Sequence, residues 1–129
     1  MNPRKPLVLV LDDSEDLLSF ATATLESGGY QVLPAQDLTQ MEAHLSQHQP
    51  DLLLVDIMMP EVLGYDLVGY LREMLGVKAP LLLFSSMNDA KLAEYVKRSG
   101  ATGFVRKDPG LATLLANVQS FLPNDLRPS

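Results

Sequence analysis

The chain has 129 residues, a length that fits one domain and leaves little room for a second. It contains no cysteine, which excludes disulfides, zinc–thiolate sites and cysteine nucleophiles. The formal net charge of −6 argues against a general nucleic-acid-binding protein, because such proteins carry a basic face. We therefore expect no direct contact with nucleic acid.

The apolar segments of the sequence are short. The longest continuous apolar runs, such as 7–11 and 81–84, cannot span a bilayer, and residues 1–6 contain no apolar signal core. We therefore expect a cytoplasmic protein without membrane contact.

No Gly/Ser-rich linker, internal repeat or low-complexity tract divides the sequence. We therefore expect a single domain over residues 1–129, with a core over about 6–121 and a tail or the start of a linker over 122–129. Residues 1–5 and 123–129 are expected to fray, as chain ends commonly do.

Short apolar runs alternate with longer amphipathic stretches along the chain. Three of the runs are apolar at nearly every position, which is typical of strands that are covered on both faces. Two weaker runs are expected at the edges of the same sheet. In chain order, the predicted strands are 6–11, 30–33, 52–55, 81–84 and 103–106.

Between the strands, apolar residues recur with the 3.6-residue period of an amphipathic helix. Gly28, Gly76 and Gly100 indicate helix ends, and the spacing of Thr39 and Glu42 indicates a capping box that opens a helix. In chain order, the predicted helices lie over about 17–25, 39–45, 67–75, 92–96 and 111–122.

Strands and helices thus alternate five times, which predicts an α/β fold. We expect a doubly wound (βα)5 arrangement, with a five-stranded parallel sheet and right-handed crossovers. The expected strand order is 2-1-3-4-5, as in the three-layer sandwich of flavodoxin-like proteins. Such a sheet binds ligands beyond the carboxyl ends of its strands, where the strand order reverses.

Polar side chains follow four of the five predicted strands. Asp12 and Asp13 follow the first strand, Asp56 the third, Ser85 the fourth and Lys107 the fifth. Each has a plainer explanation when taken alone. Acids and serines cap helices or close turns, and lysines are commonly solvated surface charges. Their conjunction at one edge of the sheet favours a common site.

Electrostatics indicates what such a site would hold. Two carboxylates about 4 Å apart repel by roughly 4 kcal/mol at an effective dielectric near 20. Three clustered carboxylates therefore take up protons or hold a cation. Oxygen ligands with room for water suit Mg²⁺ or Mn²⁺ better than zinc. A divalent ion beside an accessible carboxylate and a lysine favours phosphoryl transfer to that carboxylate.

These residues closely resemble the receiver domains of bacterial two-component response regulators, in particular the chemotaxis-type single-domain regulators. The resemblance covers about residues 6–121. It is carried by 8–13 (VLVLDD), 50–60 (PDLLLVDIMMP) with Gly64, 83–86 (LFSS) and 100–107 (GATGFVRK).

The resemblance implies a role for each acidic residue. Asp56 would accept a phosphoryl group from a histidine kinase or a phosphotransfer protein and later lose it by hydrolysis. Asp13, Asp56 and the backbone carbonyl of Met58 would bind Mg²⁺ or Mn²⁺, with Asp12 acting through water. The chain would be a signalling domain with self-phosphorylation and self-dephosphorylation, not an enzyme with a separate substrate.

The resemblance also implies a conformational switch. Lys107 would contact the phosphoryl group, and Ser85 would move to hydrogen-bond it. Phe104 would report that movement through its rotamer. Taken alone, Phe104 favours an edge-strand packing residue, whereas its spacing from Lys107 supports the switch. A downstream protein partner would bind the face formed by the fourth helix, fifth strand and fifth helix, with the chain as a monomer or a phosphorylation-dependent dimer. The basic cluster over 91–107 is either a solvated helix face or part of that binding face.

The sequence departs from the family pattern at three places. Asp108 stands between Lys107 and Pro109, where the family has proline directly after the lysine. Ser85 stands where threonine is common, which keeps the hydroxyl. Residues 61–64 read EVLG and add an acid near the site.

Other functions remain open on the sequence alone. A receiver-like docking module that works without phosphorylation is kept open by the displaced Pro109. An aspartate-nucleophile phosphatase is disfavoured because the first strand ends Asp12-Asp13-Ser14 and not Asp-x-Asp, and because there is no cap domain. A flavin-binding electron carrier is disfavoured because four acids over 12–16 would repel a flavin phosphate.

Overall fold

The computed structural model describes residues 4–59, 62–107 and 113–127. The strands of its main sheet are β1 (Leu7–Leu11), β2 (Gln31–Ala35), β3 (Leu52–Asp56), β6 (Leu81–Ser85) and β7 (Gly103–Arg106). The helices are α1 (Glu15–Ser27), α2 (Leu38–Leu45), α3 (Gly64–Gly69), α4 (Asp89–Ser99) and α5 (Leu114–Ser120). The five strands are parallel in the order β2-β1-β3-β6-β7, which confirms the predicted topology.

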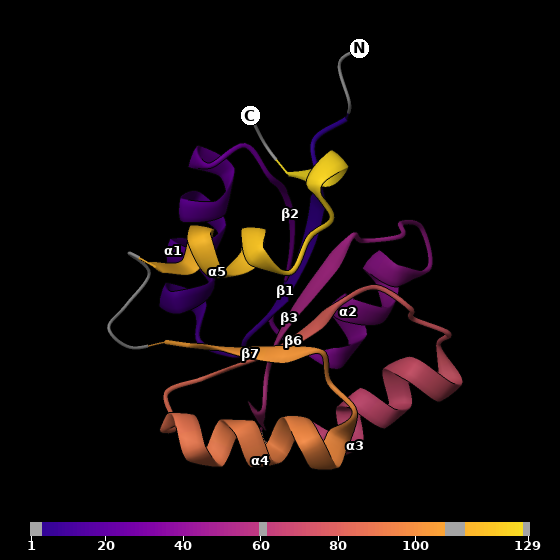
Figure 1. Ribbon diagram of the computed structural model, residues 1–129. Helices are drawn as coiled ribbons and strands as arrows, with labels where there is room; N and C mark the ends of the chain where they lie inside the picture. The colour runs from indigo at the N-terminus through magenta and orange to yellow at the C-terminus, as the bar shows by residue number, and fades with distance from the viewer. Residues whose placement is uncertain (1–3, 60–61, 108–112, 128–129) are drawn as a thin grey trace.

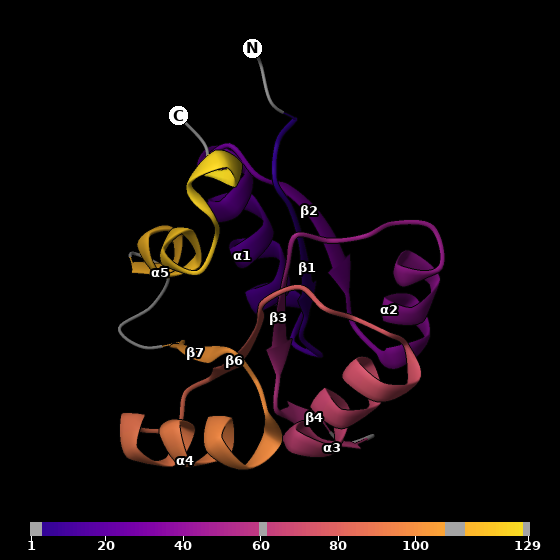
Figure 2. The ribbon, with the colours of Figure 1, turned by 45° about the vertical axis from the view of Figure 1, so that its right-hand side comes forward.

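Helices cover both faces of this sheet and make a three-layer sandwich (Figures 1 and 2). Alternate residues of each strand point to opposite faces. Val8, Leu54 and Phe84 belong to a buried cluster with residues of α1 and α5, whereas Leu9 and Leu53 belong to a cluster with residues of α2, α3 and α4. The central strands are apolar throughout because each has two buried faces. None of the described helices is long and apolar enough to cross a membrane.

Edge strand β2 extends past the predicted range of 30–33 to Ala35. Pro34 lies within it, opposite Val10 of β1. Proline has no N–H for the ladder, so the sequence pattern ended the strand before it. An edge strand tolerates proline because one of its sides has no neighbouring strand to receive that N–H.

The third predicted helix, over about 67–75, is not α-helical throughout. After α3, the chain forms a π-helical turn over Tyr70–Met74. The wider turn moves Leu75 off the buried face, so that it is 37% exposed although its spacing from buried Leu71 predicts burial. A short hairpin of β4 (Met58–Met59) and β5 (Val62–Leu63), which the sequence did not predict, precedes α3.

The predicted capping box at Thr39 is wrong by two residues. Asp37 caps α2, and its side chain accepts a hydrogen bond from the Gln40 N–H at 2.8 Å. The Gln40 side chain in turn accepts from the N–H of Gln36 at 2.7 Å. Asp37 and Gln40 thus form a variant of the predicted box, in which the second acceptor takes the N–H of Gln36 before the cap and not that of the cap residue.

Described residues near both chain ends make specific contacts. Arg4 forms an ion pair with Asp51, and residues Asn124–Leu126 form a 3-10 helix. Arg127 then donates from Nε to the Leu122 carbonyl at 3.0 Å. These contacts oppose fraying at Arg4 and over 123–127, and the fraying of 1–5 and 123–129 stays a prediction. Residues 111–112, at the start of the predicted last helix, lie outside the described residues.

Candidate metal and phosphoacceptor site

The acidic pair that follows β1 does not include the residue that caps α1. Ser14 is the N-cap, and its hydroxyl accepts from the Leu17 N–H at 3.3 Å. Asp12 Oδ1 instead accepts from the Ser14 N–H at 2.9 Å, and the Asp12 N–H donates to the Ala35 carbonyl at 3.0 Å. The alternative in which Asp12 or Asp13 caps the helix is therefore wrong, and the Asp12 carboxylate is fixed at the end of the sheet.

Asp56 is the last residue of β3 and is only 3% exposed. Its Oδ1 accepts a hydrogen bond from the Met58 N–H at 2.9 Å. In the ladder, Leu11 of β1 pairs with Val55 of β3, so the next residues along, Asp12 and Asp56, emerge side by side.

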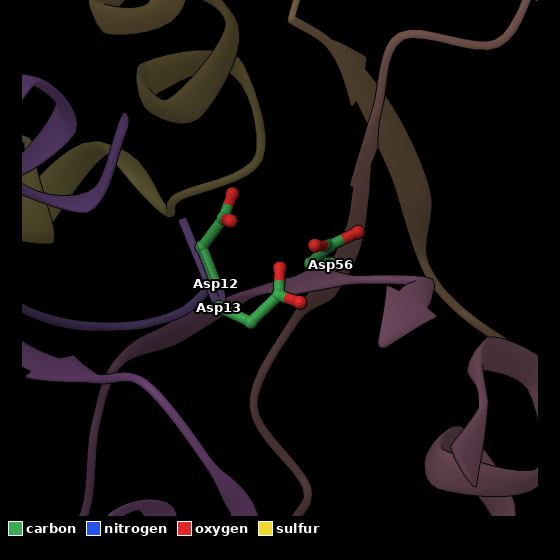
Figure 3. Close-up of side chains that lie close together, drawn as sticks. All are labelled: Asp12, Asp13 and Asp56. Atoms are coloured by element: carbon green, nitrogen blue, oxygen red, sulfur yellow. The ribbon is translucent and has the colours of Figure 1, made fainter. Parts of the chain in front are cut away.

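The carboxylates of Asp12, Asp13 and Asp56 converge, as Figure 3 shows. Each contributes an oxygen, and these oxygens lie within 4.8 Å of one another. Asp12 is fully buried and Asp13 is exposed, so the group reaches from the sheet edge to solvent. Hard oxygen donors with one side open to water fit Mg²⁺ or Mn²⁺.

The Lys107 ammonium lies against two of these carboxylates. Its Nζ is 2.9 Å from Asp12 Oδ2 and 3.6 Å from Asp56 Oδ2. The Lys107 N–H donates to the Ser85 carbonyl at 2.8 Å, which fixes the lysine backbone just past the end of β7. The side chain is 18% exposed. It is therefore part of the site and not the solvated surface charge that was the plainer interpretation.

The pKa of Asp56 is raised above its ordinary value. Burial is the largest cause, because desolvation disfavours the carboxylate. The Met58 N–H and the Lys107 ammonium oppose the rise, while the charges of Asp12 and Asp13 add to it. A cation at this position would favour the ionised carboxylate.

The two predicted switch residues have different surroundings. Ser85 is 2% exposed at the end of β6, beside β3, and its Oγ accepts from the Met87 N–H at 3.1 Å. Phe104 is half-buried on β7, where it pairs with Leu83. It lines an open groove of about 650 Å³ between α4 and α5, whose lining does not include Asp12, Asp13 or Asp56.

Sequence reasoning missed Phe84, whose ring centroid is 5.1 Å from Lys107 Nζ. The alternation of side chains along β6 places Phe84 on the same face as Leu82, in one buried cluster with Val105. This alternation can be read from the sequence. Asp108 and Glu61, two of the departures from the family pattern, lie outside the described residues.

The chain belongs to the response regulator receiver domain family, whose model matches residues 8–119. It is thus a receiver domain of the kind found in two-component signalling. Among solved structures, it is similar to the chemotaxis response regulator CheY4 of Vibrio cholerae, with a TM-score of 0.81 and 28% identity over 92% of this chain and 99% of that one.

Curated relatives differ in how much of them the chain covers. Protein PilH of Pseudomonas aeruginosa is 30% identical over 116 residues, which are 89% of this chain and 96% of PilH. The transcriptional regulatory protein KdpE of Mycobacterium tuberculosis is 31% identical over 114 residues, which are 88% of this chain and 50% of KdpE. The chain therefore spans about half the length of the first curated relatives it matches, and nearly all of PilH.

Proposed function

We propose that the chain is a phosphoacceptor receiver domain in which Asp56 takes a phosphoryl group from a histidine kinase or a phosphotransfer protein. The observation that carries this proposal is the meeting of three carboxylates and one ammonium at a single sheet edge. Family membership supports it, because receiver domains act in this way in two-component signalling.

Asp12, Asp13 and Asp56 are the proposed metal-binding side chains, with the Met58 backbone carbonyl as a further ligand. Their fit rests on the donor set: three carboxylates in one cluster leave excess negative charge that one ammonium does not offset. Bound Mg²⁺ or Mn²⁺ would offset charge on the phosphoryl oxygens and favour the ionised form of Asp56.

The proposed transfer forms a bond between phosphorus and an Asp56 oxygen. The bond between phosphorus and the imidazole nitrogen of the donor breaks, and the nitrogen keeps the electron pair. Lys107 stands beside the acceptor oxygen, where its ammonium can offset charge on the transferred group. Attack of water on the phosphorus later releases phosphate and restores the carboxylate.

The proposed response passes through Ser85 and Phe104 to the face formed by α4, β7 and α5. Ser85 would exchange its hydrogen bond with the Met87 N–H for one to the phosphoryl oxygen. The groove beside Phe104 leaves room for its ring to change rotamer. Lys91, Lys97 and Arg98 are exposed on α4, which favours an acidic downstream protein partner.

The remaining parts of the proposal concern the extent of the domain, its location and its oligomeric state. Residues 1–129 act as one receiver domain with a core over about 6–121, in the cytoplasm, without contact with membrane or nucleic acid. The chain acts as a monomer or as a dimer that forms on phosphorylation.

Intact-mass spectrometry tests the proposal. Incubation with acetyl phosphate or phosphoramidate and Mg²⁺ is expected to add the mass of one phosphoryl group, and chelation of the metal is expected to prevent it. Asp56→Asn should abolish the added mass, whereas Asp51→Asn, which changes a carboxylate paired with Arg4 away from the site, should retain it. Labelling that persists in Asp56→Asn would contradict the assignment. An unlabelled wild-type protein would favour a docking module that works without phosphorylation.

A further inference from the structure

The face of the Phe84 ring lies under the Lys107 ammonium, with 5.1 Å between Nζ and the ring centroid. The ring is fully buried. We propose that Phe84 is a positioning residue, which holds Lys107 beside Asp56 through a cation–π contact. This inference rests on the proposed function, because it assigns Phe84 a role in the transfer to Asp56.

The fold fixes this contact through strand register. Phe84 pairs with Asp56 on one side and with Val105 on the other. Phe84 and Val105 belong to the cluster under α1 and α5, and Lys107 follows Val105 by two residues, so it leaves the strand end on the same face. The ring therefore lies directly below the position from which the lysine side chain reaches the acids.

The ring differs from the two carboxylates because it attracts the ammonium without accepting its N–H protons. The carboxylates of Asp12 and Asp56 attract the same protons that a phosphoryl oxygen would need. When a phosphoryl group arrives, the ammonium must turn from a carboxylate toward it. The ring attracts the charge from below without occupying those directions, so its attraction persists during the exchange.

A leucine at this position would fill similar space but would supply no quadrupole. With the ring in place, the ammonium lies 2.9 Å from Asp12 and 3.6 Å from the reacting Asp56. Without the attraction of the ring, we expect it to turn further toward Asp12. A cation–π contact of a partly desolvated ammonium corresponds to roughly a fivefold effect on a rate or an equilibrium.

Fluorination of the ring tests this role, because ring fluorines weaken the quadrupole while nearly preserving shape. Difluorinated and trifluorinated phenylalanine are placed at residue 84, and the rate of Asp56 labelling by acetyl phosphate with Mg²⁺ is followed by intact mass. We expect a graded decrease that reaches about fivefold for the trifluorinated ring. The same replacements at Phe121, which packs beside Gly103 at the start of β7, should leave the rate unchanged.

A second measurement, on the metal-free, unphosphorylated protein, separates the position of the Phe84 ring from its electrostatic attraction for the ammonium. The ring current of Phe84 should shift the ε-methylene resonance of Lys107 upfield in a carbon–proton correlation spectrum. The shift should persist with the trifluorinated ring and disappear in Phe84→Leu. An unshifted Lys107 resonance in the wild type would overturn the contact itself.

The outcomes distinguish this inference from the proposed function. A labelled wild type with a flat fluorination series would overturn the role of Phe84 and leave Asp56 as the phosphoacceptor. A wild type that is not labelled at Asp56 would overturn both. A graded series at residue 84, with none at Phe121, would support the positioning role.

Discussion

Asp56→Asn replaces one oxygen of a buried carboxylate by an amide nitrogen and keeps an oxygen that can accept the Met58 N–H. It therefore removes a charge from the site with little change in shape. We expect the metal-free variant to be more stable than the wild-type protein at neutral pH, because burial raises the pKa of Asp56 and makes its ionised form unfavourable in the folded state.

The size of the effect follows from the neighbours of Asp56. Asp12, within 4.8 Å, repels it by about 3.5 kcal/mol at an effective dielectric near 20, and Lys107, at 3.6 Å, attracts it by about 4.6 kcal/mol. Exposed Asp13 adds about 1 kcal/mol of repulsion in a water-like dielectric. These charge interactions nearly cancel, so the cost of burying the carboxylate decides the sign. We expect a gain of about 1–2 kcal/mol.

The gain has a defined pH dependence. The folded-state pKa of Asp56 lies above the unfolded value of about 3.9, so folding of the wild type costs free energy at every pH where the unfolded chain would ionise Asp56. The advantage of Asp56→Asn should be small near about pH 4, grow as the pH rises from the unfolded to the folded-state pKa and remain constant above it. Bound Mg²⁺ should reverse it, because the metal stabilises the wild-type carboxylate and the variant lacks that ligand.

Urea unfolding in EDTA and in excess Mg²⁺, repeated from about pH 4 to about pH 8, measures these effects. A variant that is less stable than the wild type in EDTA at neutral pH would refute the reasoning. A gain that is largest in acid would do so as well, because it would assign the effect to another group.

The same unfolding measurements test three other changes. Asp13→Asn should give a smaller metal-free gain, since this carboxylate is exposed, and the gain should shrink with Mg²⁺; a loss in EDTA would show that Asp13 has a structural role. Asp51→Asn should cost about 0.5–1 kcal/mol at neutral pH, because Arg4 lowers the pKa of Asp51, and the cost should vanish as the pH falls through that lowered pKa. Gly103→Ala should cost about 1–3 kcal/mol, because its Cβ would stand 2.5 Å from the Phe121 ring; an unchanged midpoint would show that the ring moves away freely.

Local sequence patterns were sufficient to predict a feature where a single physical requirement determines it. The run 52–55 is predicted as a buried strand because apolar side chains at successive positions need cover on two faces, and β3 has that cover. The acids, the serine and the lysine at the strand ends are likewise visible in the sequence. Parallel strands bring their carboxyl ends to one edge, so their convergence could be predicted before any distance was known.

Other features depend on neighbours that the sequence does not place. Pro34 remains in β2 because that strand lies at the sheet edge. The exposure of Leu75 follows from the π-helical turn, and the choice of Asp37 over Thr39 as the cap depends on where α2 begins. The place of Pro34 is decided by strand pairing between distant segments, whereas the cap of α2 depends on competing local hydrogen bonds that differ by only a few tenths to about 1 kcal/mol.

The sequence by itself determined the alternation of strands and helices, the family and the residues that could form the site. Only the tertiary structure decided that Asp12 is fully buried, that Lys107 contacts both Asp12 and Asp56, and that Phe84 lies beneath the ammonium. The reason is that periodicity and residue type depend on local chemistry, whereas burial and contact depend on the register of strands far apart in the chain.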